Sequence, residues 1–165
     1  IEQAKKNEAF FEKRFPGLQK KKRWNAGELE FIVYSKERKT TRHTCFGYGG
    51  DCGTDVSTTF SATLILLPDF AFSTSDKYVS FYISGYSSLS DRYDQDSVSI
   101  DCRFADGRKM ELRREYYYQK YGGRSEDTWG ELGTLGEYLH QELGYTNISA
   151  KDLREILQKM RSAFS

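Results

Sequence analysis

The sequence has little proline and cysteine and no long hydrophobic run, and these shortages exclude several classes of protein. Only two prolines occur among the 165 residues, whereas aromatic residues make up 15%, so the composition is not that of a disordered chain. The longest apolar run, Leu64 to Leu67, is far too short to cross a bilayer. The length allows one domain with an adequate core. We therefore expect a single soluble domain that spans residues 1–165.

The three cysteines leave the redox compartment open. Cys45 and Cys52 flank the sequence Phe-Gly-Tyr-Gly-Gly-Asp, whose composition is typical of a tight turn that could hold them opposite each other in a hairpin. A disulfide between them and two reduced thiols are both open alternatives. Cys102 is expected to be a buried core residue. Because no Cys-x-x-Cys pair accompanies His43, we expect no zinc site, and no cofactor is predicted.

The first residue gives a hint about processing. The chain begins at Ile1 without a methionine, in what resembles the middle of a helix. We interpret it as a mature or trimmed product, for which an extracytoplasmic or secreted origin as a processed fragment is one expectation. The compartment and the oligomeric state are not predicted by the sequence.

The charges are unevenly distributed although the net charge is only +1. Residues 1–43 carry 12 Lys and Arg against 6 Asp and Glu, whereas residues 44–165 carry 13 against 18. Such polarity can steer a partner toward the molecule, or it can reflect two ends of the chain that attract each other.

Residues 78–118 organise the rest of the chain, because their side chains alternate with a period of two. Residues 78–86 place apolar side chains on one side and hydroxyl-bearing side chains on the other, which predicts a strand with one buried face. The apolar side holds Val79, Phe81 and Ile83, and the other side holds Tyr78, Ser80, Tyr82, Ser84 and Tyr86. Residues 97–104 alternate in the same way, with Val98, Ile100, Cys102 and Phe104 on the apolar side.

The turn at Ala105-Asp106-Gly107 sets the register of the next strand. A three-residue loop with Gly107 in the left-handed conformation places Cys102 opposite Met110, whereas a two-residue loop mixes apolar and charged residues on both faces. We therefore expect the three-residue turn, which makes Asp101 and Glu111 cross-strand neighbours.

The whole pattern predicts an α+β fold. Three further strands are expected at residues 28–35, 40–48 and 56–67, so that residues 25–121 form one antiparallel sheet of about five or six strands. Residues 1–24 are expected to form a helix and a basic linker. Residues 122–165 are expected to form a helical pair, with a capping box at Thr134 and a second helix start at Ser149. All three helices are predicted to pack on one face of the sheet.

The face opposite those helices is the main candidate for function. It would present the binding residues Tyr78, Ser80, Tyr82, Ser84, Tyr86 and Tyr117. Tyrosine offers a rigid apolar ring with a polar tip, and serine offers adaptable hydrogen bonds, a combination typical of binding surfaces. Bases or sugars could stack there too, and the same residues are also ordinary on the solvent side of a sheet. We expect a non-enzymatic domain that binds a protein partner.

The first alternative is a metal-dependent nuclease or phosphodiesterase. Like charges opposite each other on a sheet are destabilising, so Asp101 and Glu111 would favour a shared divalent cation, with Arg113 stabilising phosphate charge. Over this hairpin alone, the arrangement resembles the restriction-nuclease-type superfamily, in which an Asp and a Glu-x-Lys on neighbouring strands share a metal. Arg113 stands where that superfamily has lysine, and the helix that precedes its Asp is absent. The competing interpretation is that basic neighbours simply neutralise the two acids.

A third hypothesis rests on four consecutive cations, Lys20, Lys21, Lys22 and Arg23. Together with Trp24, they could contact a membrane surface or nucleic-acid phosphates. The simpler interpretation is a solvated segment whose Trp24 packs against the sheet, and the shortness of the cluster favours it.

Overall fold

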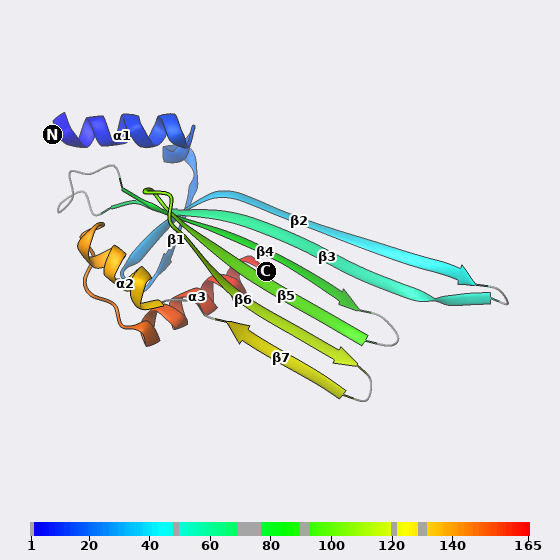
Figure 1. Ribbon diagram of the computed structural model, residues 1–165. Coiled ribbons are helices and arrows are strands. Elements are labelled where there is room, and N and C mark those ends of the chain that lie inside the picture. The colour runs from blue at the N-terminus through cyan, green and yellow to red at the C-terminus, as the bar shows by residue number, and fades with distance from the viewer. Residues whose placement is uncertain (1, 48–49, 69–76, 90–92, 120–121, 129–131) are drawn as a thin grey trace.

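The structure, a computed structural model, describes residues 2–47, 50–68, 77–89, 93–119, 122–128 and 132–165 (Figure 1). It contains one antiparallel sheet in which each of seven strands pairs with the next along the chain. The strands are β1 (Lys22–Ala26), β2 (Leu29–Gly47), β3 (Gly50–Leu66), β4 (Val79–Leu89), β5 (Tyr93–Phe104), β6 (Lys109–Gln119) and β7 (Gly122–Thr128). The helices are α1 (Glu2–Arg14), the short 3-10 helix η1 (Leu18–Lys20), α2 (Leu132–Gln141) and α3 (Ala150–Phe164).

The helices sandwich one end of the sheet, and the strands extend beyond them (Figure 1). α2 and α3 pack on one face, which we call the helical face, and Leu64, Phe81 and Ile100 point into it. The other face, which we call the open face, carries α1 only at the same end of the sheet. Beyond α1, no described element covers the open face.

The larger core lies between the sheet and the two C-terminal helices. The apolar sides of β3, β4 and β5 meet the apolar stripe of α3 there, and all of these inward-pointing residues except the half-buried Ile156 are buried. The residues are Phe60, Ala62, Leu64, Leu66, Val79, Phe81, Ile83, Val98, Ile100, Cys102, Phe104, Leu153, Ile156, Leu157, Met160 and Phe164. The period-two prediction is therefore confirmed for β4 and β5, and β3 follows the same alternation.

The predicted α+β class, with a single antiparallel sheet, an N-terminal helix and two C-terminal helices, is confirmed. The sheet has seven strands because β1 and β7 add an edge on each side. Residues 28–35 and 40–48 were expected to be separate strands, but residues 29–35 and 40–47 belong to the single strand β2, and residue 48 lies outside the described residues. The charged residues between them, 36–39, are exposed, and within this stretch the Lys36 ammonium lies 5.7 Å from the centre of the Phe164 ring.

The prediction that all three helices share one face is wrong for α1. A smaller core of Phe11, Leu18, Ile32, Ile65 and Tyr78 forms on the open face beneath it. The cause is visible in the run at the end of β3, where Leu64 and Leu66 enter the larger core while Ile65 points the other way. A strand that is apolar on both sides requires cover on both faces, and α1 supplies the second cover.

The predicted turn after β5 is confirmed. Cys102 pairs with Met110 and Asp101 pairs with Glu111, as the three-residue loop requires. Gly107 has a φ of 94°, in the left-handed region that glycine adopts without strain. The turn is closed by the Phe104 N–H, which donates to the Arg108 carbonyl at 2.9 Å.

The helix starts were predicted with mixed success. Ser149 caps α3, where its side chain accepts a hydrogen bond from the Asp152 N–H at 3.2 Å, as expected. α2 instead begins at Leu132, so Thr134 lies inside the helix and the predicted capping box is wrong. The apolar Leu132, which is buried, extends the helix by a further turn toward its N-terminus.

Candidate functional site

The open face beyond α1 carries a field of hydroxyl groups around two tyrosines. Tyr82 lies between Thr63 of β3 and Asp101 of β5, and Tyr86 lies on the same face four residues further along β4. Tyr82 is 40% exposed and Tyr86 is 36% exposed, which is unusual for rings of this size within the described residues. The two rings are therefore available to a partner.

The serines beside these rings take part in the same surface. Ser80 and Ser84 are half-buried on the open face of β4. The Ser84 and Ser99 hydroxyl oxygens lie 3.0 Å apart, within hydrogen-bond distance of each other across β4 and β5. Such hydroxyls can rotate to serve either as donors or as acceptors for an incoming group.

The prediction that Tyr78 belongs to this surface is wrong. Tyr78 is only 5% exposed, because α1 lies over it and the ring of Phe15 meets it edge-on at 5.2 Å. The ring of Phe11 approaches at 6.2 Å, and the Arg14 guanidinium carbon lies 5.4 Å from the centre of the Tyr78 ring. Tyr78 precedes β4 at the helical end of the sheet, so it serves the smaller core instead of a binding surface.

The backbone of Tyr117 lies in a row of cross-strand pairs that points to the same face of the sheet as the exposed tyrosines. Its backbone pairs with Gln95 of β5, which in turn pairs with the neighbouring β4 at Ser88, a position of the open face. The side chain of Tyr117 lies outside the described residues, so its part in the surface stays a prediction.

A shallow hollow of about 300 Å³ lies beside Tyr82 on the open face. Its lining comes from three strands and consists of Glu37, Lys39, Thr59, Ser61, Tyr82 and Ser84, with Phe60 and Gly85 contributing beneath. Tyr82 and Ser84 were predicted site residues, whereas the contributions of β2 and β3 were missed. The alternation around Phe60 could have indicated the two from β3, since residues on either side of an inward residue point to the other face.

The two acids of the nuclease hypothesis are cross-strand neighbours on the open face, as predicted. Asp101 is half-buried and Glu111 is exposed. Within the described residues, no group of three or more His, Cys, Asp or Glu side chains is placed to hold a metal ion. The side chain of Arg113 lies outside those residues. The catalytic assignment of these three residues therefore stays an untested prediction.

Cys102, next to Asp101, points to the other face and is fully buried as a free thiol. Burial raises its pKa to about 12, and the nearby negative charge of Asp101 acts in the same direction. A thiol with so high a pKa is a poor nucleophile at neutral pH. Its predicted role as a core residue is confirmed.

The four cations at 20–23 run from the last residue of η1 through Lys21 to the first two residues of β1, and all are exposed. The Lys21 ammonium lies 5.1 Å from the centre of the Tyr34 ring, and Arg23 pairs with Glu30 at 3.2 Å. Trp24 packs against Phe31 and Phe164, as the simpler interpretation predicted. Binding of Lys20, Lys21, Lys22 and Arg23 to lipid or nucleic acid stays a prediction.

The predicted hairpin around Cys45 and Cys52 is formed by β2 and β3. The backbone pairs Cys45 with Gly53, and the register shifts at the next pair. The side chains of both cysteines lie outside the described residues, so the disulfide stays a prediction.

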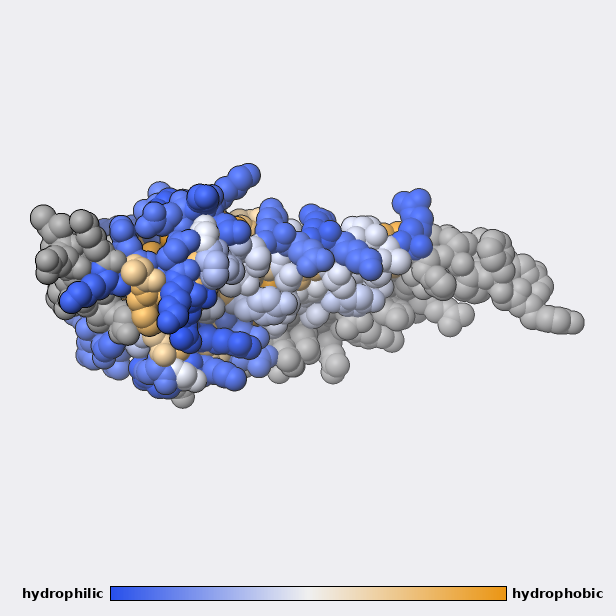
Figure 2. Space-filling model, turned by 90° about the horizontal axis from the view of Figure 1, so that it is seen from above, coloured by the Kyte–Doolittle hydropathy of each residue, from blue (hydrophilic) through white to orange (hydrophobic). Residues whose placement is uncertain are grey.

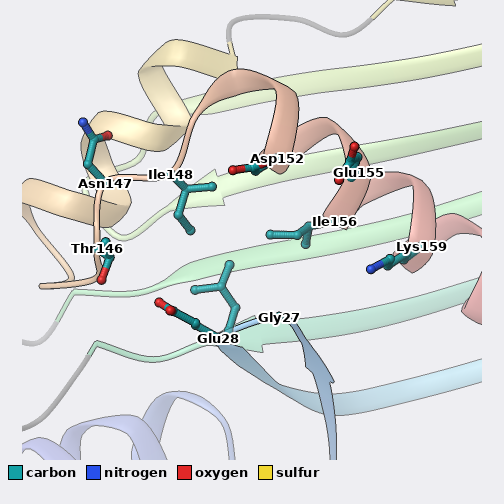
Figure 3. Close-up of a pocket in the computed structure, with 10 residues that line it drawn as sticks. Gly27, Glu28, Thr146, Asn147, Ile148, Asp152, Glu155, Ile156 and Lys159 are labelled. Carbon is teal, nitrogen blue, oxygen red and sulfur yellow. The ribbon is translucent and has the colours of Figure 1, made fainter.

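A second hollow, of about 320 Å³, lies between α3 and the turn that joins β1 to β2 (Figure 3). Leu29, Ile148 and Ile156 give it apolar surface. Glu28, Asp152, Glu155 and Lys159 add charges of both signs. None of these residues was predicted as a site. Since the four charged side chains are exposed to water, the lining favours no single ligand class.

Comparisons with protein-family models, with curated proteins and with solved structures found no match to this chain. Among the described helices, none combines the length and the apolar character needed to cross a bilayer.

Proposed function

We propose that this chain is a non-enzymatic binding domain that contacts a protein partner through the open face around Tyr82 and Tyr86. The observation that supports the proposal is the exposure of these two rings on a stretch of sheet that no described helix covers. A sheet whose other face is packed against helices is rigid, so these rings lose little freedom on binding.

The residue types suit a protein interface better than plain solvent. A tyrosine buries a large apolar ring while its hydroxyl keeps a hydrogen bond, and aromatic residues are enriched at the centres of interfaces. The surrounding hydroxyls of Thr63, Ser84 and Ser99 supply adaptable polar contacts. The hollow beside Tyr82 can receive a side chain of the partner, and Glu37 and Lys39 place charges of both signs at its edge.

Paired substitutions test the proposal. Tyr82→Ser with Tyr86→Ser removes both rings from the open face, and Leu89→Ser removes a side chain that is 57% exposed on the opposite face of the same strand. Each protein is immobilised and used to capture partners from extracts of its native cells, followed by titration of the captured partner. We expect the dissociation constant of the double variant to be higher by a factor of roughly 30 or more, as for loss of an interface anchor worth about 2 kcal/mol.

Folding and specificity are checked in parallel. Because the substituted side chains are exposed, the free energy of unfolding should change by no more than about 0.5 kcal/mol per substitution. Leu89→Ser should bind as the wild type does. Equal binding by the double variant and the wild type would remove the basis of the proposal.

A further inference from the structure

Among the described strands, none pairs with the outer edge of β2 over most of its length. β1 pairs with β2 only from Leu29 to Val33, and β2 continues to Gly47. No described strand pairs with the outer edge beyond Val33 (Figure 1). Figure 2 looks down on the side where β2 forms this edge and shows a mostly hydrophilic described surface along the sheet. Free edge strands offer N–H and C=O groups to another strand.

The opposite edge of the sheet is formed by β7, which pairs only with β6 among the described strands. The outer stretch of β2 and the strand β7 stand at the two ends of the same rows of paired residues. The row of paired residues that begins at Arg38 in β2 passes through Phe60, Gly85, Val98 and Arg114 and ends at Asp127 in β7. The next row begins at Lys39 and ends at Glu126.

These rows give the two edges complementary charges. If a second copy is placed beside the first so that the rows continue, Arg38 of one copy faces Asp127 of the next, and Lys39 faces Glu126. β2 and β7 run in opposite directions within the sheet, so the new pairing is antiparallel like all the others. Opposite charges directly across an antiparallel pair are stabilising.

Pairing of β2 with itself is disfavoured by the same reasoning. An antiparallel β2–β2 contact over residues 37–43 places Arg38 opposite Arg42, and like charges across a pair are destabilising. Charged residues on an edge strand normally prevent association. Here the basic residues of β2 disfavour pairing with another basic edge and favour pairing with an acidic edge.

We propose that copies of this chain associate edge to edge, with β7 of one copy adding to residues 37–43 of β2 in the next, so that the antiparallel sheet continues between them. The contact is heterologous, so it produces chains of copies unless the rotation between neighbours closes a ring. Lys39 also lines the hollow beside Tyr82, so the contact borders the open face, but the inference rests on the charges of the two edges and not on the exposure of Tyr82 and Tyr86.

Sedimentation velocity over a range of protein concentrations tests the proposal with two charge-reversed variants. Arg38→Glu with Lys39→Glu makes both edges acidic, and Glu126→Lys with Asp127→Lys makes both edges basic. We expect the wild type to form larger species as concentration rises, and each variant alone to need at least ten times the concentration. An equimolar mixture of the two variants should recover the association, because every contact then pairs an acidic edge with a basic one.

A control carries the same change of net charge as the acidic variant, but elsewhere in the molecule. Lys151→Glu with Lys159→Glu alters two exposed residues of α3 and should associate as the wild type does. Circular dichroism confirms that each variant is folded. A wild type that stays monomeric at every concentration, variants that still associate alone, or a mixture that does not recover would each overturn the proposal.

Discussion

Three tyrosines spaced four residues apart along one strand pattern have different environments, and the residue type alone does not decide which of them are exposed. Tyr78, Tyr82 and Tyr86 all fall on the open face in the sequence pattern, but only the last two are exposed. The alternation fixes the face, whereas the packing of α1 fixes where along that face the surface is free. The first can be predicted from the sequence because the pleat has a strict period of two. The second depends on a contact between residues 67 positions apart, Phe11 and Tyr78.

Gly85 lies within the candidate surface, and the ring of Phe60 packs closely against its backbone. A Cβ at this position would lie 2.0 Å from the ring of Phe60, so the ring would have to move. We predict that Gly85→Ala lowers the free energy of unfolding by about 1–3 kcal/mol, as for an overpacked core. Denaturant titration measures the change.

The matched control for that substitution is Gly133→Ala in α2, where an added Cβ meets nothing within 4 Å. Alanine is the better helix former, so this variant should be unchanged or more stable by up to about 1 kcal/mol. A Gly85→Ala protein as stable as the wild type would contradict the close packing of Phe60 on Gly85.

At the scale of elements, the sequence predicted what each segment buries better than what lies beside it. The faces of β3, β4 and β5, the turn at Gly107 and the cap at Ser149 follow from local spacing, and the structure confirms them. The position of α1 could not be predicted in this way, because its weak apolar stripe fits either face of the sheet. The clue was the apolar run Leu64 to Leu67, which has too many apolar residues for a strand with one solvent face.

The docking of α1 can be tested through Phe11, which is 1% exposed in the smaller core. We predict that Phe11→Ala weakens the docking of α1 by about 3–5 kcal/mol, the usual cost of removing a buried phenylalanine. Hydrogen exchange should accelerate in α1 and leave the amides of β4 and β5 protected, because the larger core on the other face is unchanged.

Lys6→Ala, at an exposed position of the same helix, serves as the control and should leave exchange in α1 close to that of the wild type. If Phe11→Ala exposed β4 and β5 as much as α1, the division of the fold into two cores would be wrong.

The whole molecule combines a packed end with an extended sheet that projects beyond it (Figure 1). The helices stabilise the sheet at one end, and no described element covers the rest of the open face or pairs with the outer edge of β2 beyond Val33. The uneven distribution of charge in the sequence corresponds here to geometry, since β2 supplies basic residues at one edge and β7 supplies acidic residues at the other. The sequence predicted tyrosines and serines on the face that we call the open face, but it did not predict the sheet order that creates these edges.

The most direct test of the central claim, that the open face binds a protein, is site-specific photo-crosslinking in native extracts. A photoreactive amino acid replaces Tyr82 in one variant and Leu89 in another, so that the probe lies on opposite faces of the same strand. The account predicts an adduct of one discrete mass from position 82 and none from position 89. Adducts of the same kind from both positions, or from position 89 alone, would contradict it.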